Sequence, residues 1–215
     1  MKIYENQRVA DWAVVQGKNK LEHTRTGPVH ISEVLRCLRQ SYYSRTEPTP
    51  VTAEKVMHFA IGYALQEWFF GPEADGEEHN GIVFSVDLKI GTDVLEFKST
   101  RKSYETKKGK FEPNPEWIER TTAYCAVHNV KRAHILVYFI HQDALHAWTI
   151  EPTDEEIQEV KRKFGERAGI LTQALTSGEA PPVTTRSAEW ECKFCPYTIH
   201  CKEFLDGSSG DNDKQ

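Results

Sequence analysis

The sequence predicts an α/β fold in which a mixed β-sheet is flanked by helices. Segments with helical periodicity and segments with the two-residue period of strands follow one another along the chain. Their order is helix, helix, hairpin, helix, two strands, helix, which is typical of helices packed on the faces of a sheet. With 215 residues the chain is long enough for one domain with a sizeable hydrophobic core.

The composition is that of an ordinary globular protein, with 39% hydrophobic and 27% charged residues. No apolar run approaches the roughly 20 residues that a membrane-spanning helix needs. The first residues lack the apolar segment of a secretory signal, so we expect a cytoplasmic protein without a membrane partner. The net charge of −5 excludes a generally basic nucleic-acid binder, so any nucleic-acid contact must come from local basic clusters.

The predicted domain is flanked by two less regular ends. Residues 1–30 carry scattered charge without a clear period, and we interpret them as a loosely attached N-terminal arm. The domain itself is expected over 31–205. The tail 206–215 is rich in small and charged residues and is expected to be disordered.

Two helices are expected before the first strand. Within 31–45, Ser32 is a plausible N-cap for a helix that carries Cys37 and several basic residues. A second helix runs from near Thr52 to about Phe70, with an apolar stripe that includes Val56, Phe59 and Tyr63.

Residues 83–100 alternate with period two on both sides of Gly91 and Thr92, which predicts a half-buried β-hairpin. Glycine in the first position of a two-residue loop suits a type II′ turn. That turn fixes the register of the facing residues, which are Ile90 and Asp93, Leu88 and Leu95, Val86 and Phe97, and Asp87 and Glu96.

Asp87 and Glu96 then oppose each other on the polar face of the hairpin, and Lys98 lies two residues beyond Glu96 on the same face. Opposed residues have Cβ atoms about 5 Å apart, so like charges there destabilise the pair. A divalent cation bound by carboxylate oxygens would remove that cost, which makes the pair a candidate metal site. The alternative is an amphipathic hairpin whose polar face meets solvent.

The second half of the domain is expected to hold a helix, two strands and a long helix. Asn114 and the proline after it start a helix that continues to about His128. Two strands follow, over 133–140 and 145–150. A capping box at Thr153 opens a helix that ends by Gly178.

The chain contains five cysteines, and an odd number without a secretory signal argues against a disulfide framework. Three of them lie close together near the C-terminus and need a fourth ligand to complete a metal site. Cys37 is the candidate, because Cys125 lies in the middle of a predicted helix and is expected to be a small core residue. Four thiolates suit an iron–sulfur cluster or structural zinc equally, and His200 leaves a Cys₃His zinc site open. The other three cysteines fall within ten residues near the C-terminus, a spacing typical of metal sites: Cys192, Cys195 and Cys201.

Together these motifs resemble the RecB-type nucleases of the PD-(D/E)XK superfamily and, more narrowly, the CRISPR-associated "Cas four" exonucleases. The resemblance covers roughly residues 30–203. It implies a restriction-endonuclease-like mixed central sheet flanked by helices, with the chain ends joined by a four-cysteine iron–sulfur site. It is carried by the segment from Ser32 to Arg39, by Val86-Asp87 followed by Glu96-Phe97-Lys98, and by the segment from Cys192 to Cys201.

The resemblance implies a metal-dependent DNA exonuclease, a hydrolase that acts on single-stranded DNA ends in CRISPR spacer acquisition, antiviral defence or DNA processing. The CRISPR integrase complex is an implied partner. Asp87 and Glu96 would bind Mg²⁺ or Mn²⁺ with help from the main-chain carbonyl of Phe97. Lys98 would complete the catalytic set by orienting or helping to deprotonate the attacking water.

The resemblance also assigns the cysteines and a set of DNA contacts. An iron–sulfur cluster, 4Fe-4S in preference to 2Fe-2S, would be held between the N-terminal helix (31–45) and the C-terminal loop (186–205). Its ligands would be Cys37, Cys192, Cys195 and Cys201. The expected DNA-binding residues are Arg120, Tyr124 and Lys102.

Two positions depart from the family pattern. Gln66 stands where the family has a histidine metal ligand, and its amide oxygen would be a weaker ligand. Arg120 stands where the family has glutamine, and arginine suits a contact with DNA phosphate. Both departures favour an alternative: a catalytically weak or inactive nuclease-fold module that binds DNA or a partner and is stabilised by a four-cysteine metal site.

Overall fold

The computed structural model describes residues 7–21, 26–71, 76–107, 109–186 and 189–201. The chain divides into two compact units, each assembled from segments that are far apart in sequence. Unit 1 comprises Met1–Arg25, Pro50–Gly76 and Ser85–Thr153, and unit 2 comprises Thr26–Thr49, Glu77–Phe84 and Asp154–Gln215. The range 31–205, over which the sequence predicts one domain, therefore includes parts of both units.

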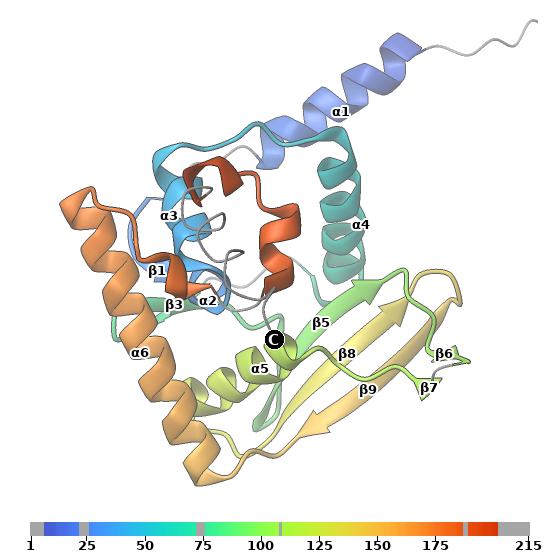
Figure 1. Ribbon diagram of the computed structural model, residues 1–215. Helices are drawn as coiled ribbons and strands as arrows, with labels where there is room; N and C mark the ends of the chain where they lie inside the picture. The colour runs from blue at the N-terminus through green and yellow to red at the C-terminus, as the bar shows by residue number, and fades with distance from the viewer. Residues whose placement is uncertain (1–6, 22–25, 72–75, 108, 187–188, 202–215) are drawn as a thin grey trace, which may run out of the picture. The chain divides into compact units, whose positions relative to one another are not determined.

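Unit 1 is built on a four-stranded mixed sheet in the order β4-β5-β8-β9, of which Figure 1 labels β5, β8 and β9. β5 and β8 are parallel, and each pairs with its other neighbour in the antiparallel sense. The parallel pair is joined through helix α5 (Pro115–His128), the kind of crossover that parallel strands require. The strands are β4 (Leu88–Ile90), β5 (Asp93–Thr100), β8 (Ala133–Phe139) and β9 (Ala144–Ile150), which confirms the two predicted strands after α5.

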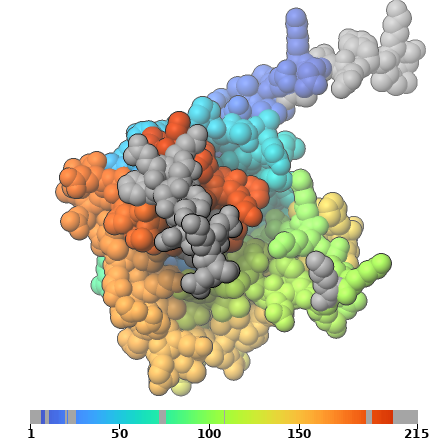
Figure 2. All heavy atoms as spheres, viewed as in Figure 1, coloured from blue at the N-terminus to red at the C-terminus, as the bar shows by residue number. Residues whose placement is uncertain are grey.

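The core of unit 1 lies against β8, whose residues alternate between buried and partly buried positions. Ile135, Val137 and Phe139 have no exposed surface. Five partly buried apolar residues pack around them: Tyr104, Phe111, Trp117, Trp148 and Ile150. The short strands β6 (Glu105–Thr106) and β7 (Gly109–Lys110) pair with each other, and all four residues are exposed (Figure 2).

Helices α1 (Gln7–Leu21) and α4 (Ala53–Phe70) pack against each other in unit 1, and α4 also contacts β5. The Thr52 hydroxyl accepts a hydrogen bond of 3.2 Å from the backbone N–H of Lys55, which confirms the predicted start of α4. At the other end of the helix, the rings of Phe69 and Phe70 lie 5.8 and 5.5 Å from that of Phe97. The C-terminal half of α4 is therefore anchored on the strand that carries Glu96.

Unit 2 contains a small three-stranded sheet in the order β1-β3-β2, with β1 parallel and β2 antiparallel to β3. Its longest helix, α6 (Asp154–Ser177), buries Phe164, Ala168, Leu171 and Ala174, which share one helical face. The remaining elements are β1 (Val29–His30), β2 (Glu77–His79), β3 (Ile82–Phe84), α2 (Ile31–Leu35), α3 (Leu38–Thr46), and the 3₁₀ turns η1 (Val183–Thr185), η2 (Glu189–Phe194) and η3 (Thr198–Cys201).

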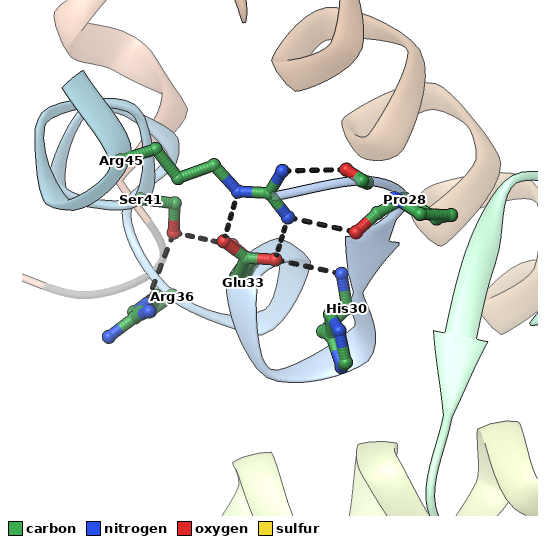
Figure 3. Close-up of polar contacts among 7 residues, drawn as sticks. Pro28, His30, Glu33, Arg36, Ser41 and Arg45 are labelled. Carbon is green, nitrogen blue, oxygen red and sulfur yellow. Dashed lines mark hydrogen bonds and ion pairs between the residues drawn. The ribbon is translucent and has the colours of Figure 1, made fainter. Parts of the chain in front are cut away.

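A buried ion pair ties β1, α2 and α3 together (Figure 3). The Arg45 guanidinium donates to both carboxylate oxygens of Glu33 at 2.8 and 2.7 Å, and the backbone N–H of His30 donates to the same carboxylate at 2.8 Å. Arg45 also donates to the carbonyls of Gly27 and Pro28 at 2.8 and 2.9 Å. The side chains of Arg45 and Glu33 are only 8% and 1% exposed, so the pair lies in the interior of unit 2.

The single helix expected within 31–45 is two helices, because the backbone leaves the helical region at Arg36 and Cys37. The carbonyls released by this break are paired: the Arg167 guanidinium donates to those of Val34 and Arg36 at 2.5 and 2.6 Å, and Ser41 donates to that of Glu33 at 2.8 Å. The break places Cys37 at the N-cap of α3 instead of on a helix side.

Two further elements differ from the sequence expectation. Part of the predicted arm 1–30 is helix α1, which packs against α4 although none of its described side chains is buried. The first residues of the predicted hairpin belong to β3, which pairs in the sheet of unit 2. The predicted disordered tail, 206–215, lies outside the described residues. Among those residues, no helix is both long and apolar enough to cross a membrane.

Candidate functional site

Two of the predicted site residues, Glu96 and Lys98, lie on β5 of the β4–β5 hairpin, and a third, Asp87, directly precedes β4. Ile90 faces Asp93 and Leu88 faces Leu95, as predicted, and Gly91 has the positive φ, 59°, that its turn position requires. The ladder ends at Leu88, so the predicted backbone pairing does not extend to Asp87. The Asp87 side chain contacts β5 instead: its Oδ2 accepts a hydrogen bond of 2.6 Å from the backbone N–H of Phe97.

Asp87 is held by one bond to each oxygen. Gln66 Nε2, from α4, donates to Oδ1 at 2.9 Å, while the N–H of Phe97 binds Oδ2. Burial raises the pKa of Asp87 to about 6, with the nearby charge of Glu96 acting in the same direction. Lys98, the N–H of Phe97 and Arg120 act against this rise and do not overcome it. The ionised form of Asp87 is therefore destabilised by its surroundings, and a further positive charge nearby would stabilise it.

Glu96 lies in the middle of β5 and is 1% exposed. Its Oε1 contacts the Lys98 ammonium and accepts a hydrogen bond from Arg120 Nη1 at 3.0 Å. Burial raises the pKa of Glu96, but Lys98 and Arg120 outweigh burial and hold that pKa below its usual value. The buried carboxylate is therefore ionised and compensated by two cations.

Arg120 and Tyr124 join this network from α5. They are four residues apart, so they share one face of the helix. The Tyr124 hydroxyl donates to the carbonyl of Ser85 at 2.7 Å, just before Asp87 in the chain. Burial raises the pKa of Tyr124 well above its usual value, and the charge of Glu96 adds to the rise. The phenol is therefore neutral and ties α5 to the segment that carries Asp87.

The structure brings six predicted residues into one hydrogen-bonded and charged group: Asp87, Glu96, Lys98, Gln66, Arg120 and Tyr124. Lys102 is not among these contacts. It is exposed, and its ammonium lies 6.0 Å from the centre of the Phe111 ring. Gln66 contacts Asp87 through its amide nitrogen, whereas the sequence suggests its oxygen as a metal ligand. The group offers carboxylate oxygens for a hard cation and two basic side chains for a phosphate.

The four predicted cluster cysteines of unit 2 line one small cavity: Cys37, Cys192, Cys195 and Cys201. All four are partly exposed and none is in a disulfide. Burial raises the pKa of both Cys37 and Cys195, and the other cysteines of the group add smaller effects in the same direction. Cys125 belongs to unit 1 and is fully buried in α5, consistent with a core residue.

Two residues that line this cavity, Glu191 and Arg39, are not found by looking for metal ligands in the sequence. The Glu191 carboxylate accepts the backbone N–H of Cys37 at 3.1 Å and so links the early cysteine to the late ones. Arg39 also lines the cavity. In the sequence, only their positions point to them: Glu191 directly precedes Cys192, and Arg39 lies two residues after Cys37. Within the part of the chain that the structure describes, no three His, Cys, Asp or Glu side chains are grouped closely enough to bind one metal ion.

No protein-family model matches this sequence, and comparison with curated proteins finds no match. Among solved structures, the crystal structure of SSO0001 matches with a TM-score of 0.58 and 17% identity, covering 90% of this chain and 95% of that one. At this identity the likeness shows a shared fold.

Two crystal structures of LHK-Exo match more weakly. One is of LHK-Exo in complex with dAMP, with a TM-score of 0.46 and 15% identity over 70% of this chain and 91% of that one. The other is of LHK-Exo as an alkaline exonuclease from Laribacter hongkongensis, with a TM-score of 0.46 and 14% identity over 76% and 95%.

Proposed function

We propose that this chain is a metal-dependent DNA exonuclease, a phosphodiester hydrolase that acts on single-stranded DNA ends. One observation carries the proposal: Asp87, directly before β4, and Glu96 and Lys98, on β5, lie together in a mostly buried charged group. A chance polar face of a hairpin would be expected to point into solvent, whereas Glu96 is 1% exposed. The resemblance of the same residues to a nuclease motif supports this assignment.

The donor set fits Mg²⁺ or Mn²⁺. Mg²⁺ is usually bound by one or two carboxylates, with waters and substrate phosphates completing its shell. Asp87 and Glu96 supply the carboxylates. Burial, together with the charge of Glu96, raises the pKa of Asp87 to about 6, so a cation bound beside it would favour its ionised form. The main-chain carbonyl of Phe97 and the side chain of Gln66 are the further proposed ligands. When bound, such an ion polarises the phosphate and lowers the pKa of a coordinated water.

The basic residues have separate proposed roles. Lys98, in contact with Glu96, positions the attacking water and stabilises the charge that develops on the phosphate. Arg120 is 24% exposed, so its guanidinium can reach a DNA phosphate from its place beside Glu96. Tyr124 shares a face of α5 with Arg120 and holds that helix in place through its hydrogen bond to Ser85. Lys102 is an exposed contact for the phosphate backbone further along the strand.

A cleavage assay on end-labelled single-stranded DNA with Mn²⁺ tests the proposal. We expect Asp87→Ala and Lys98→Ala each to lower the rate by roughly 10²-fold or more, since each removes a group that stabilises the transition state. Lys89→Ala is the matched control, because Lys89 is an exposed lysine on the same hairpin. Equal rates in all four proteins would overturn the proposal.

A second candidate is a catalytically weak or inactive nuclease-fold module that binds DNA or a partner. The compensation of Glu96 by Lys98 and Arg120 favours it, because the carboxylate is already neutralised without a metal ion. This candidate predicts DNA binding that is unchanged in Asp87→Ala, together with no cleavage under any divalent ion. A CRISPR integrase complex is the proposed partner in either case, and co-purification of the two tests it.

We further propose that the cysteine cavity holds an iron–sulfur cluster, 4Fe-4S in preference to 2Fe-2S. The donor chemistry fits: four thiols line one cavity. Arg39 lines it too, and its buried Nε has no hydrogen-bond partner among the described residues. Cys37, Cys192, Cys195 and Cys201 would hold the cluster and join the early and late segments of unit 2. Iron and sulfide content of anaerobically purified protein tests this, and zinc in their place would contradict it.

A further inference from the structure

Arg39 holds an unusual position among the residues that line the cysteine cavity. It is the one basic side chain among the described lining residues, beside four cysteines and Glu191. Its Nη1 donates to the carbonyl of Pro181 at 2.8 Å, and its Nη2 donates to that of His200 at 2.9 Å. These bonds fix the guanidinium between α3 and the C-terminal segment.

One donor of this fixed guanidinium is unused. Arg39 Nε is buried and has no hydrogen-bond partner among the described residues. A buried N–H without an acceptor is costly, because it has lost its bond to water and gained nothing in return. Arg39 cannot turn to find an acceptor without breaking its bonds to Pro181 and His200. An acceptor supplied from within the cavity would remove that cost.

The aromatic residues around Arg39 restrict its movement further. The Tyr43 ring lies 5.6 Å from the guanidinium carbon, and the Tyr43 hydroxyl accepts from Arg39 Nη2 at 3.3 Å. The ring of His200 stacks on Tyr43 at 4.1 Å with an interplanar angle of 14°. A fixed positive charge next to four thiolates would offset the negative charge that a cysteine-bound cluster carries.

We propose that Arg39 is a positioning residue for the cysteine-bound cluster: its Nε–H donates to a sulfur atom of the bound group, and its charge raises the reduction potential of that group. Hydrogen bonds to cluster sulfur and nearby charge are among the factors that set such potentials. This inference rests on the iron–sulfur part of the proposed function and is independent of nuclease activity.

The test compares anaerobically purified wild-type protein with Arg39→Gln, Arg39→Lys and Lys193→Gln. Arg39→Gln removes the charge and the fork of donors, whereas Arg39→Lys keeps the charge and removes the Nε donor. Lys193→Gln is the matched control: it removes the same charge from the cysteine loop, but Lys193 is exposed and does not line the cavity. The readouts are the reduction potential of the loaded fraction, by optical titration, and the rate of iron loss to a chelator.

We expect Arg39→Gln to shift the oxidised-to-reduced ratio at a fixed potential by about tenfold towards the oxidised form, which is about 59 mV for a one-electron couple. Iron loss should be at least tenfold faster. Arg39→Lys should shift both in the same direction by less, and Lys193→Gln should match the wild type. If Arg39→Gln does not fold, Arg39→Lys decides: a lower reduction potential supports the inference, and an unchanged or higher one overturns it.

The outcomes separate this inference from the cluster itself. Wild-type protein without iron would overturn the iron–sulfur proposal and this inference with it. A loaded wild type whose potential is unchanged in the Arg39 variants would overturn this inference alone. That holds even if the variants lose iron faster, because faster loss with an unchanged potential is what a purely structural role of Arg39 predicts.

Discussion

The buried ion pair of Glu33 and Arg45 should be the main polar contributor to the stability of the segment that presents Cys37. Glu33→Gln keeps the shape of the side chain and removes its charge, leaving Arg45 buried with a neutral partner. Removing one partner of a buried pair typically costs about 3–5 kcal/mol. The two side chains are 8% and 1% exposed, so little solvent screening reduces this figure. We expect Glu33→Gln to lower the free energy of unfolding of this segment by about 3 kcal/mol, since the glutamine oxygen can still accept one hydrogen bond.

Hydrogen exchange over residues 26–49 measures this effect where it acts. A loss of about 3 kcal/mol corresponds to a drop in protection of roughly 10²-fold, at about 1.4 kcal/mol for each factor of ten. Glu159→Gln is the matched control, because Glu159 also pairs with an arginine, Arg162, but both side chains are more than half exposed. We expect no measurable change in that control.

A double-mutant cycle separates the pair from its surroundings. Arg45→Met alone should be as damaging as Glu33→Gln, because it leaves a buried carboxylate unpaired. The double variant Glu33→Gln, Arg45→Met should cost clearly less than the sum of the two single variants. Strictly additive losses, or a Glu33→Gln effect as small as that of Glu159→Gln, would refute the claim that the buried pair holds this segment together.

Three further outcomes follow from the charges of unit 1. Arg120→Gln removes one of the two cations on Glu96, so metal-induced thermal stabilisation should begin at lower Mn²⁺ concentration, and an unchanged concentration dependence would contradict competition between Arg120 and the metal. Burial raises the pKa of Cys125 to about 11, so this thiol should react with iodoacetamide at pH 8 only after unfolding, as peptide mass spectrometry would show. Hydrogen bonds from Arg132 and His134 hold the pKa of Asp93 below its usual value. Asp93 therefore stabilises the fold above its unfolded pKa of about 3.9, and the difference in thermal midpoint between wild type and Asp93→Asn should shrink as the pH falls below about 4.

Elements with local boundary signals could be predicted from the sequence. Helix α5 starts directly after the predicted N-cap Asn114 and ends at His128, before the C-cap Asn129, which takes the left-handed conformation with φ 51°. The two-residue turn at Gly91 predicted the register of the two pairs nearest the turn, Ile90 with Asp93 and Leu88 with Leu95, but the ladder does not continue to Asp87. Helix α4 shows the limit of periodicity: of its predicted stripe, Val56 is buried, but Phe59 and Tyr63 are 42% and 49% exposed. A helix that is apolar on most sides does not indicate which side packs.

The candidate site was predictable only where one strand or loop supplies the chemistry. Asp87, Glu96 and Lys98 follow from a single hairpin, so the alternation of side chains is enough to group them. Of the two cations that compensate Glu96, only Lys98 follows in this way. Arg120 comes from α5, and nothing local in the sequence sets how that helix is rotated against β5. Arg120 and Lys98 therefore offset at Glu96 the like-charge repulsion that the sequence predicts for the pair, while Asp87 retains a raised pKa of about 6.

This asymmetry between the two carboxylates determines how a metal ion could enter the site. Burial and the charge of Glu96 raise the pKa of Asp87, whereas both cations contact the same oxygen of Glu96, Oε1. A divalent ion shared by the two carboxylates would make the positive charge of Arg120 superfluous at Glu96. Because Arg120 is 24% exposed, its guanidinium could then turn towards solvent, where a DNA phosphate is a better partner than water. Under the proposed function, binding of the metal and binding of DNA would therefore reinforce each other through one side chain.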